Sequence, residues 1–300
     1  MKILLADAGM PFDFNTPYVD PIGGSEISIL LLAKGLKELG HQVVILSTLQ
    51  TSPIQEKNIL LDSINNFEAY EKIADVVILN RFIPPNINEI EKSKLFFYTH
   101  DAYDQRNIQW LRKENIENIF NKIFCVSEWQ KNTFVKYFNC NTNKFETIGN
   151  LIDYSLYYGY TKRDENKLIF ASIPYKGLEV LPDLFNDICI QSKRDLKLDV
   201  FSSFKLYGNE QEDKQYENVY RKLANTKNIN LHKPISMKDL AYEFSSSSLL
   251  IHPCQYHETF GRVFVESMAG GCIPVTVNNG ANKEVIQDNG FIIDMPNIEN

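Results

Sequence analysis

The chain has 300 residues, 44% of them hydrophobic and 23% charged, which is typical of a soluble globular protein with room for two domains. The formal net charge is −7 and there is no long basic run, so nucleic acid is not expected as a main partner, because binding a phosphate backbone needs clustered lysine and arginine. The five cysteines lie far apart in sequence, which fits neither a disulfide framework nor a zinc motif and favours a reducing compartment.

The N-terminal stretch MKILLADAG is too short and too acidic for a signal peptide. No apolar run approaches the length of a membrane span. We therefore expect a cytoplasmic protein, for which peripheral contact with a membrane stays open.

The first half of the chain alternates short apolar runs with amphipathic stretches. Ser25 to Leu39 has helical periodicity, with Ser25 as its expected N-cap and Gly40 as its stop. The expected strands are apolar throughout rather than alternating, which favours a parallel sheet covered on both faces. These strands are expected at residues 2–7, 42–47, 75–80, 94–100 and 122–127, and a further helix is expected at 128–138.

An aromatic and polar stretch without clear period, residues 150–166, is interpreted as the connection between two domains. Strand–helix alternation resumes after it, so that both halves predict doubly wound α/β domains. Ligands of such sheets bind at the carboxyl ends of the strands, and the cleft between the domains is the expected site. In this half, strands are expected at 167–172, 196–202, 228–233, 248–253 and 273–277, and helices at about 177–191, 211–224, 236–244 and 262–270.

Four residues in the predicted loops could bind a ligand. Gly23 and Gly24 precede a helix, where backbone N–H groups can approach an anion, although a plain glycine turn explains them equally well. The pattern is neither GxGxxG nor a Walker loop, which argues against dinucleotide and NTPase sites. Lys176 follows a strand and can pair with a diphosphate, although on position alone a surface lysine is the simpler interpretation. His100 ends a strand, where it can donate to a ligand oxygen, shuttle a proton or simply bond to loop backbone.

The stretch HPCQYHETFGRVFVESMAGGCIPV carries two glutamates around a predicted helix start. Glu258 lies on the strand-to-helix loop, and Glu266 lies about one turn into the helix among apolar neighbours, where a carboxylate is costly unless it faces a ligand. The amides of Phe260, Gly261 and Arg262 at the helix start offer N–H groups for a phosphate. The alternative is a surface helix with two incidental glutamates. The pattern favours a ligand with sugar, phosphate and ribose in a row.

Glu258-x7-Glu266, with Phe260-Gly261 inside it and ESMAGGCIPV after it, resembles the signature of glycosyltransferase family 4, the retaining group 1 glycosyltransferases with the GT-B fold. The likeness covers nearly the whole chain. Further segments resemble the family in the same order: GGSEISILLLAKGLKELGHQVVILS, FCVSEWQKNTF, IGNLID with Leu151 where glycine is usual, and NNGANKEVI with Glu284 at its acidic position.

The resemblance implies two Rossmann-like α/β domains facing across a cleft, with C-terminal helices short or absent: an acceptor-binding domain at residues 1–158 and a nucleotide-sugar-binding domain at 159–300. It implies an enzyme that transfers a sugar with retention from a UDP- or GDP-sugar to a glycan or other acceptor hydroxyl. No cofactor is expected, and no metal, because there is no Asp-x-Asp motif. By this resemblance the catalytic residues are Glu258, His100 and Lys176, and the nucleotide-sugar-binding residues are Gly23, Gly24, Ser172, Lys176, Phe260, Gly261, Arg262 and Glu266.

Two departures from the family pattern bear on function. The family's arginine about five residues before the lysine is replaced by Ala171 or Ser172, so half of the diphosphate clamp is absent unless Arg262 replaces it. The chain ends at Asn300, earlier than the family usually does, which fits either a minimal or a truncated protein. Two alternatives stay open: a non-catalytic partner or regulatory module that keeps the fold, and a sugar-nucleotide epimerase.

Overall fold

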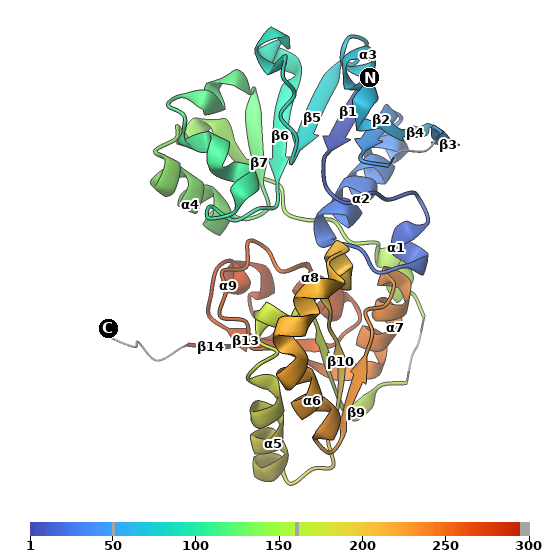
Figure 1. Ribbon diagram of the computed structural model, residues 1–300, viewed down its shortest axis with the longest axis vertical. Helices are drawn as coiled ribbons and strands as arrows, with labels where there is room; N and C mark the ends of the chain where they lie inside the picture. The colour runs from blue at the N-terminus through green and yellow to red at the C-terminus, as the bar shows by residue number, and fades with distance from the viewer. Residues whose placement is uncertain (50–51, 160–161, 295–300) are drawn as a thin grey trace. The chain divides into compact units, whose positions relative to one another are not determined.

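The computed structural model describes residues 1–49, 52–159 and 162–294. The chain forms two compact units, of which the first comprises Met1–Pro17 and Gly23–Ile152 and the second comprises Tyr18–Ile22 and the chain from Asp153 onward (Figure 1). The main division thus follows Ile152, whereas the boundary predicted from the sequence follows Tyr158. Residues 160 and 161 of the predicted linker, and the last six residues of the predicted second domain, lie outside the described part.

The first unit is built on an eight-stranded sheet in the order β3-β4-β2-β1-β5-β6-β7-β8. Neighbouring strands are parallel except β3 and β4, which are antiparallel. Its strands are β1 (Lys2–Asp7), β2 (Gln42–Ser47), β3 (Ile54–Glu56), β4 (Ile59–Ser63), β5 (Val76–Asn80), β6 (Leu95–Thr99), β7 (Lys122–Cys125) and β8 (Phe145–Thr147). Its helices are α2 (Gly24–Glu38), α3 (Phe67–Glu71) and α4 (Glu128–Phe138), and the short α1 (Thr16–Val19) lies where the chain passes between the units.

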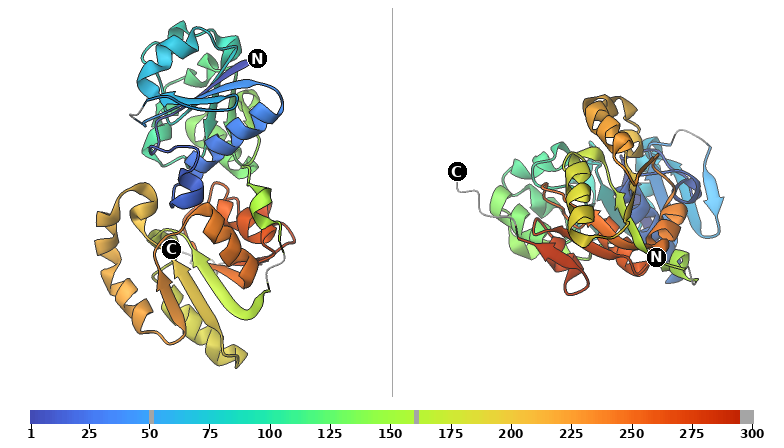
Figure 2. Two further views of the ribbon diagram at one scale, coloured as in Figure 1. Left: turned by 90° about the vertical axis from the view of Figure 1, so that its right-hand side faces the viewer. Right: turned by 90° about the horizontal axis from the view of Figure 1, so that it is seen from below.

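The second unit is built on a six-stranded parallel sheet in the order β11-β10-β9-β12-β13-β14. Its strands are β9 (Asp164–Ala171), β10 (Lys197–Phe201), β11 (Ile229–His232), β12 (Ser247–His252), β13 (Ile273–Val277) and β14 (Phe291–Ile293). Its helices are α5 (Leu181–Ser192), α6 (Glu217–Asn225), α7 (Met237–Ser246), α8 (Arg262–Ala269) and α9 (Asn282–Ile286), and helices lie on both faces of the sheet (Figures 1 and 2).

Short 3-10 helices fill many of the loops between these elements. They cover Ile64–Asn66, Ile87–Glu89, Lys92–Lys94, Arg106–Arg112, Ile116–Ile119, Thr142–Lys144, Tyr154–Tyr157, Pro174–Lys176, Phe204–Tyr207 and Glu210–Tyr216. Among the described residues, no helix is both long and apolar enough to cross a lipid bilayer.

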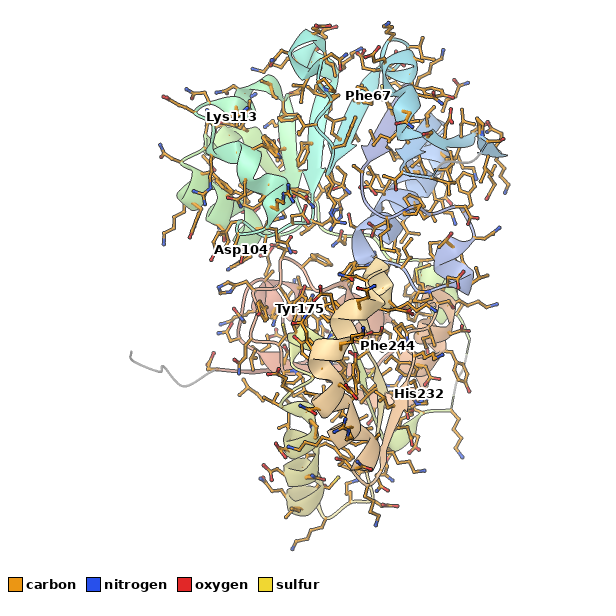
Figure 3. The ribbon with its side chains drawn as sticks, in the orientation of Figure 1. Phe67, Asp104, Lys113, Tyr175, His232 and Phe244 are labelled. Atoms are coloured by element: carbon orange, nitrogen blue, oxygen red, sulfur yellow. The ribbon has the colours of Figure 1, made fainter. Side chains whose placement is uncertain are left out.

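Alternate residues of the central strand β9 enter two separate hydrophobic clusters. Leu168 and Phe170 pack in one cluster with Phe185 of α5, whereas Ile169 packs in the other with Phe244 of α7 (Figure 3) and with α8. Since a strand points successive side chains to opposite faces, both faces of this sheet are buried. The prediction of a doubly wound α/β domain in this half of the chain, made from its strand–helix alternation, is confirmed.

Three local predictions are wrong. Ser25 is not the N-cap of the first long helix, because α2 begins at Gly24 with Gly23 at its N-cap, and Ser25 is buried within the first turn. The helix predicted at 211–224 is divided into the 3-10 turn Glu210–Tyr216 and α6. The helix predicted from residue 177 begins only at Leu181, because Gly177 adopts a left-handed φ of +105° that no helix continues.

The same Gly177 brings two functional loops of the second unit together. A Cβ atom at this position would lie 2.6 Å from the carbonyl oxygen of Pro253, in the loop that follows β12. Only glycine therefore allows the loop after β9 and the loop after β12 to approach this closely.

We expect Gly177→Ala to lower the free energy of unfolding of the second unit by about 2 kcal/mol, because a left-handed backbone and a backbone clash coincide there. Gly35→Ala in α2 is the control, since a Cβ there meets nothing within 4 Å; it should be neutral or stabilising by up to about 1 kcal/mol. Urea unfolding of both variants measures this. Equal stability of the Gly177→Ala variant and the unchanged protein would contradict the argument.

Candidate active site

The strand order of each sheet reverses direction at one point, where open α/β sheets bind their ligands. In the second unit the chain runs from β9 outward through β10 to β11 and then returns to β12 on the other side of β9. The loops after β9 and β12 therefore meet at this point. They carry Ser172 and Lys176 on one side and Glu258, Phe260 and Gly261 on the other, all predicted as site residues.

Lys176 and Glu258 form a nearly buried ion pair at this switch point. Lys176 Nζ lies 2.6 Å from Glu258 Oε1, and the side chains are 22% and 7% exposed. Burial by itself would raise the pKa of the Glu258 carboxyl, but the ammonium of Lys176 and a hydrogen bond from His252 outweigh it and lower that pKa to about 2. The carboxylate correspondingly raises the pKa of Lys176, so both groups are charged at neutral pH.

His252, the last residue of β12, forms a hydrogen bond with the Glu258 carboxylate and helps to hold it in place. Its Nε2 lies 3.2 Å from Glu258 Oε1, and the ring is fully buried between Phe170 and Phe264. Burial lowers the pKa of this imidazole, so it is neutral and donates its Nε2–H to the ionised carboxylate. A backbone bond from the amide of Ala281 to the carbonyl of Glu258, 2.8 Å long, fixes the loop further.

His252, Cys254 and Glu258 place ligand atoms within 4.8 Å of one another, a grouping that could hold a metal ion. The ammonium of Lys176 already lies at hydrogen-bond distance from the carboxylate of this group. Burial also raises the pKa of the Cys254 thiol to about 12, and its S–H donates to the carbonyl of Tyr256. The donor set thus fits a lysine cation better than a metal ion, which would have to displace Lys176.

Helix α8 begins beside this pair. Its N-cap Gly261 has a left-handed φ of +73° and, as a glycine, offers no side chain of its own to cap the first amides of this eight-residue helix. Glu266, one turn into α8, is 8% exposed and accepts from Arg262 over 2.5 Å. Arg262 is therefore paired with Glu266 through an i,i+4 contact, and Ser172, at the place of the family's arginine, donates its amide to the carbonyl of Phe201.

Aromatic residues line the loops on the Lys176 side. Tyr175 (Figure 3) lies 4.9 Å from Tyr256 and 6.1 Å from Phe204, measured between ring centroids. Burial raises the pKa of Tyr175 to about 12, so its hydroxyl is neutral. These ring contacts join the loop after β9 to the loops after β10 and β12.

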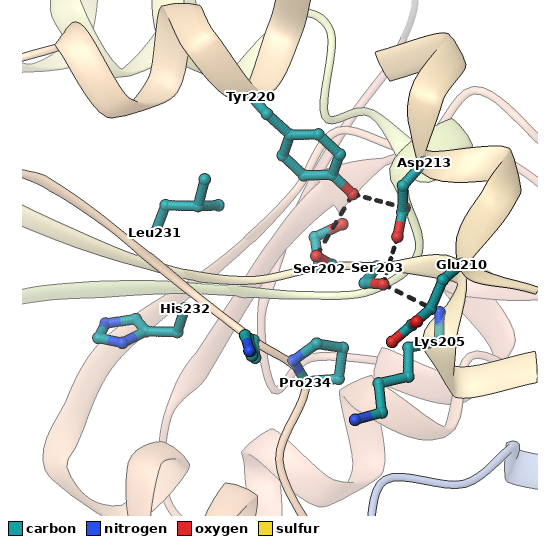
Figure 4. A pocket seen from close by; sticks show the side chains of 10 residues that line it. Ser202, Ser203, Lys205, Glu210, Asp213, Tyr220, Leu231, His232 and Pro234 are labelled. Atoms are coloured by element: carbon teal, nitrogen blue, oxygen red, sulfur yellow. Dashed lines mark hydrogen bonds between the residues drawn. The ribbon is translucent and has the colours of Figure 1, made fainter. Parts of the chain in front are cut away.

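A pocket that sequence reasoning missed lies at the carboxyl ends of β10 and β11 (Figure 4). Asp213 accepts hydrogen bonds from Ser203, from the amide of Phe204 and from Tyr220, and so connects the segments that line the pocket. Ser202 is 3% exposed, and its hydroxyl has no hydrogen-bond partner among the described residues. The polar residues that directly follow β10 and β11, namely Ser202, Ser203 and Lys233, could have indicated this pocket from the sequence. The pocket holds about 370 Å³ and is lined by Ser202, Ser203, Lys205, Glu210, Asp213, Tyr220, Leu231, His232, Lys233 and Pro234.

In the first unit, the switch point lies between β1 and β5 and gathers buried charge. Arg81, with a left-handed φ of +51°, contacts Glu26 over 3.2 Å and Asp101 over 3.1 Å. Asp7, the last residue of β1, is fully buried nearby, and burial together with Glu26 raises its pKa to about 7. Arg81 and Asp101 directly follow predicted strands, Asp7 ends one, and Glu26 lies two positions after the glycine pair.

The predicted residues of the first unit lie at this same cluster. Gly23 and Gly24 begin α2, and Gly23 has a φ of −65° that any residue adopts, so backbone conformation does not require glycine there. His100 directly follows β6, and its Nδ1 lies 3.4 Å from the hydroxyl of Ser25. Gln130 of α4 donates to the carbonyls of Thr99 and Asp101 and so fixes the loop that carries the imidazole.

Comparison with known proteins finds a family match in the second half of the chain. Residues 161–300 match the model of the family described as glycosyl transferases group 1. This segment, just under half of the chain, is similar to the group 1 glycosyl transferases. The predicted resemblance to group 1 glycosyltransferases is confirmed over this segment, and the predicted enzyme class, a glycosyltransferase, agrees with it.

Two kinds of relatives extend the comparison to the rest of the chain. Spore coat protein SA from Bacillus subtilis is 28% identical over 123 residues, which span 40% of this chain and 31% of that protein. Sucrose-phosphate synthase from Thermosynechococcus elongatus has a TM-score of 0.76 at 14% identity, over 98% of this chain and 86% of that one. Anabaena HepE, solved with UDP-glucose, has a TM-score of 0.67 at 17% identity, over 98% and 85%. At these identities the structures establish the fold, which is the predicted GT-B class of two parallel-sheet α/β domains.

Because the pKa of Glu258 lies below its ordinary 4.5, the ionised form stabilises the fold above pH 4.5, and this contribution is lost as the pH falls from 4.5 toward 2. We expect the protein to lose on the order of 2–3 kcal/mol more of its unfolding free energy over this interval than Glu258→Gln does. Urea unfolding between pH 5 and pH 2.5 measures the difference. Parallel pH profiles would show that Glu258 and Lys176 are not coupled.

Proposed function

We propose that this chain is a retaining glycosyltransferase that moves a sugar from a nucleotide-diphosphate sugar to a hydroxyl of a glycan or glycoconjugate. The observation that carries the proposal is the Lys176–Glu258 pair at the switch point of a group 1 glycosyl transferase domain, next to the α8 start and Glu266. A nucleotide sugar carries a sugar, a diphosphate and a ribose in that order. In this proposal Glu258 binds the sugar, Lys176 and the helix amides bind the diphosphate, and Glu266 binds the ribose.

The diphosphate is the leaving group, and negative charge grows on it in the transition state. We assign its stabilisation to Lys176 and to the amides of Phe260, Gly261 and Arg262, which need no reorganisation during the reaction. A lysine has three N–H donors, so the ammonium can keep Glu258 and bind a phosphate oxygen at once. Ser172 supplies a hydroxyl, not a charge, where the family has arginine.

The two glutamates then take different parts of the donor. Glu266 accepts from ribose hydroxyls with the lone pairs that Arg262 leaves, and Arg262 pairs with this carboxylate rather than binding the diphosphate. Glu258 contacts the donor sugar. Lys176 and His252 both bind its Oε1, which makes it a poor covalent nucleophile and favours front-face transfer, with a donor phosphate oxygen taking the acceptor proton.

The nucleobase belongs in the pocket at the ends of β10 and β11. That pocket lies two strand spacings, or about 10 Å, along the sheet edge from the point between β9 and β12. Leu231 and Pro234 offer apolar contacts, and the hydroxyl of Ser202 offers a hydrogen bond for a base edge. Uracil and guanine both stay in the proposal, so the donor is a UDP- or GDP-sugar.

The first unit binds the acceptor in this proposal, and His100 donates a hydrogen bond to the transferred sugar.

Two other functions can be distinguished from this one by assay. A regulatory module would bind neither donor nor acceptor productively, and an epimerase would release a free sugar of inverted configuration without an acceptor. We therefore propose incubation with a panel of UDP- and GDP-sugars, with and without oligosaccharide acceptors, followed by measurement of nucleoside diphosphate release. If the protein neither binds nor cleaves any nucleotide sugar of the panel, the proposal that it is such an enzyme is refuted.

We expect Glu266→Ala to weaken donor binding about 10- to 100-fold, because hydrogen bonds to a charged group contribute about 1.5–3 kcal/mol. Glu258→Ala should reduce turnover more than nucleotide affinity. Glu165→Ala is the control, because Glu165 lies exposed near the opposite end of β9. Calorimetric titration with the nucleoside diphosphate measures affinity, and unchanged affinity in Glu266→Ala would remove the ribose assignment.

We propose that Lys176 does the work of a metal ion, so that transfer needs none. Activity should stay within about twofold after treatment with EDTA, whereas Lys176→Ala should lower kcat/KM by about 100-fold or more, the range that loss of one preorganised charge-stabilising group causes. Coupled release assays with and without chelator measure this. Loss of activity in EDTA that Mg²⁺ or Zn²⁺ restores would contradict the proposal.

A further inference from the structure

A chain of buried hydrogen bonds connects His100 with the end of β1. Asn80 Nδ2 lies 2.9 Å from Asp7 Oδ1 and 2.9 Å from Ser25 Oγ, and Ser25 Oγ lies 3.4 Å from His100 Nδ1. Asp7 and Asn80 are fully buried, and Ser25 is 6% exposed. The four side chains come from the ends of β1, β5 and β6 and from the first turn of α2, so the switch point of the first unit brings them together.

The number of protons in this chain fixes the direction of each bond. Both hydrogens of the Asn80 amide are used, one toward Asp7 and one toward Ser25. Ser25 Oγ therefore accepts from Asn80 and has one proton left to donate. Within the described residues, His100 Nδ1 is the one acceptor placed for it, and a buried hydroxyl proton without an acceptor is costly. Nδ1 must then carry a lone pair rather than a hydrogen.

We infer that Ser25, Asn80 and Asp7 are positioning residues that hold His100 as its neutral Nε2–H tautomer, so that the imidazole acts as a hydrogen-bond donor to the ligand and not as a base. The functional part rests on the proposed glycosyl transfer. A donor at Nε2 suits a sugar hydroxyl or ring oxygen, whereas a base at that atom would compete with the phosphate oxygen for the acceptor proton. The tautomer itself follows from the hydrogen bonds, whatever the reaction.

The arrangement depends on Asp7 as an acceptor. Were Asp7 to carry a proton, it could donate to Asn80, the amide would turn over, and Ser25 would donate to Asn80 instead and accept from Nδ1–H. The groups that face Asp7 are Asn80 and Arg81 at the end of β5, Glu26 on α2, Asp101 after β6 and the amide of Gly9. Burial and Glu26 raise the pKa of Asp7 to about 7, so the Nε2–H tautomer is favoured above neutral pH and weakened below it.

The test reads the tautomer directly by two-bond ¹H–¹⁵N NMR at pH 8 on the full chain labelled at histidine. Only five histidines are present, and His100→Gln assigns the signal. We expect the ¹⁵N shifts of His100 to show a protonated Nε2 and an unprotonated, hydrogen-bonded Nδ1. A protonated Nδ1 in the unchanged protein would overturn the inference, whether or not the protein has transferase activity.

Two variants test this series of hydrogen bonds, one at Asn80 and one at Ser25. Asn80→Asp replaces the donor to Ser25 by an acceptor, so the tautomer should invert to Nδ1–H, which a merely structural role of Asn80 would not cause. Ser25→Ala should remove the hydrogen-bond shift of Nδ1 and lower kcat several-fold with donor KM within about twofold, and Ser25→Thr should restore both. If Asn80→Asp does not fold, Ser25→Ala decides alone, and an unchanged Nδ1 shift in it would refute the chain.

The failure of the function and the failure of the inference give different results. Without any transferase activity on the donor panel, the proposed function fails while the NMR result still reports the tautomer. With activity and a protonated Nδ1, the proposed function stands and this role of Ser25, Asn80 and Asp7 is wrong.

Discussion

The ion pair between Lys176 and Glu258 is the constraint on which the second unit depends. Both charges are largely removed from water, Glu258 more completely than Lys176, and each offsets the cost of burying the other. The loops that carry them must therefore approach closely, which Gly177 permits by lying against the carbonyl of Pro253. The neutral ring of His252 and the amide of Ala281 complete the support of the Glu258 loop. The site is thus built as one polar group of atoms with a fixed geometry, which is what stabilisation of a developing charge requires.

In the first unit, the switch point between β1 and β5 holds more carboxylates than cations. Around Arg81 lie three buried carboxylates, of Asp7, Glu26 and Asp101, so charge is not balanced pair by pair as it is in the second unit. The excess is accommodated by a raised pKa at Asp7, that is, by a proton within reach at neutral pH. Such an arrangement costs stability and is common at sites where protonation and hydrogen-bond direction matter. It gives the first unit a polar cluster in its interior that could not be predicted from its continuous apolar strands.

Prediction from sequence succeeded where local pattern and burial agree. The strands of 2–7, 42–47 and 273–277 were predicted to the residue because each is a short, mainly apolar run with a paired strand on both sides in its sheet. It failed at Ser25, where a serine before an apolar run resembles an N-cap but its hydroxyl is used by Asn80 and His100. The edge strands β3, β8 and β14 were missed because three-residue strands carry too little periodicity to be distinguished from loops.

The sequence by itself determined the fold class, the family of the second domain and the identity of most candidate side chains, because these depend on periodicity and on a local motif around Glu258 and Glu266. Only the tertiary structure decided what those side chains bind. It paired Lys176 with Glu258 and Arg262 with Glu266, placed a pocket at the ends of β10 and β11, and joined Asp7 and Asn80 to Ser25 and His100. Three of these sets join residues more than twenty positions apart, and their hydrogen-bond directions follow from burial and from the count of protons and lone pairs, which one-dimensional spacing does not contain.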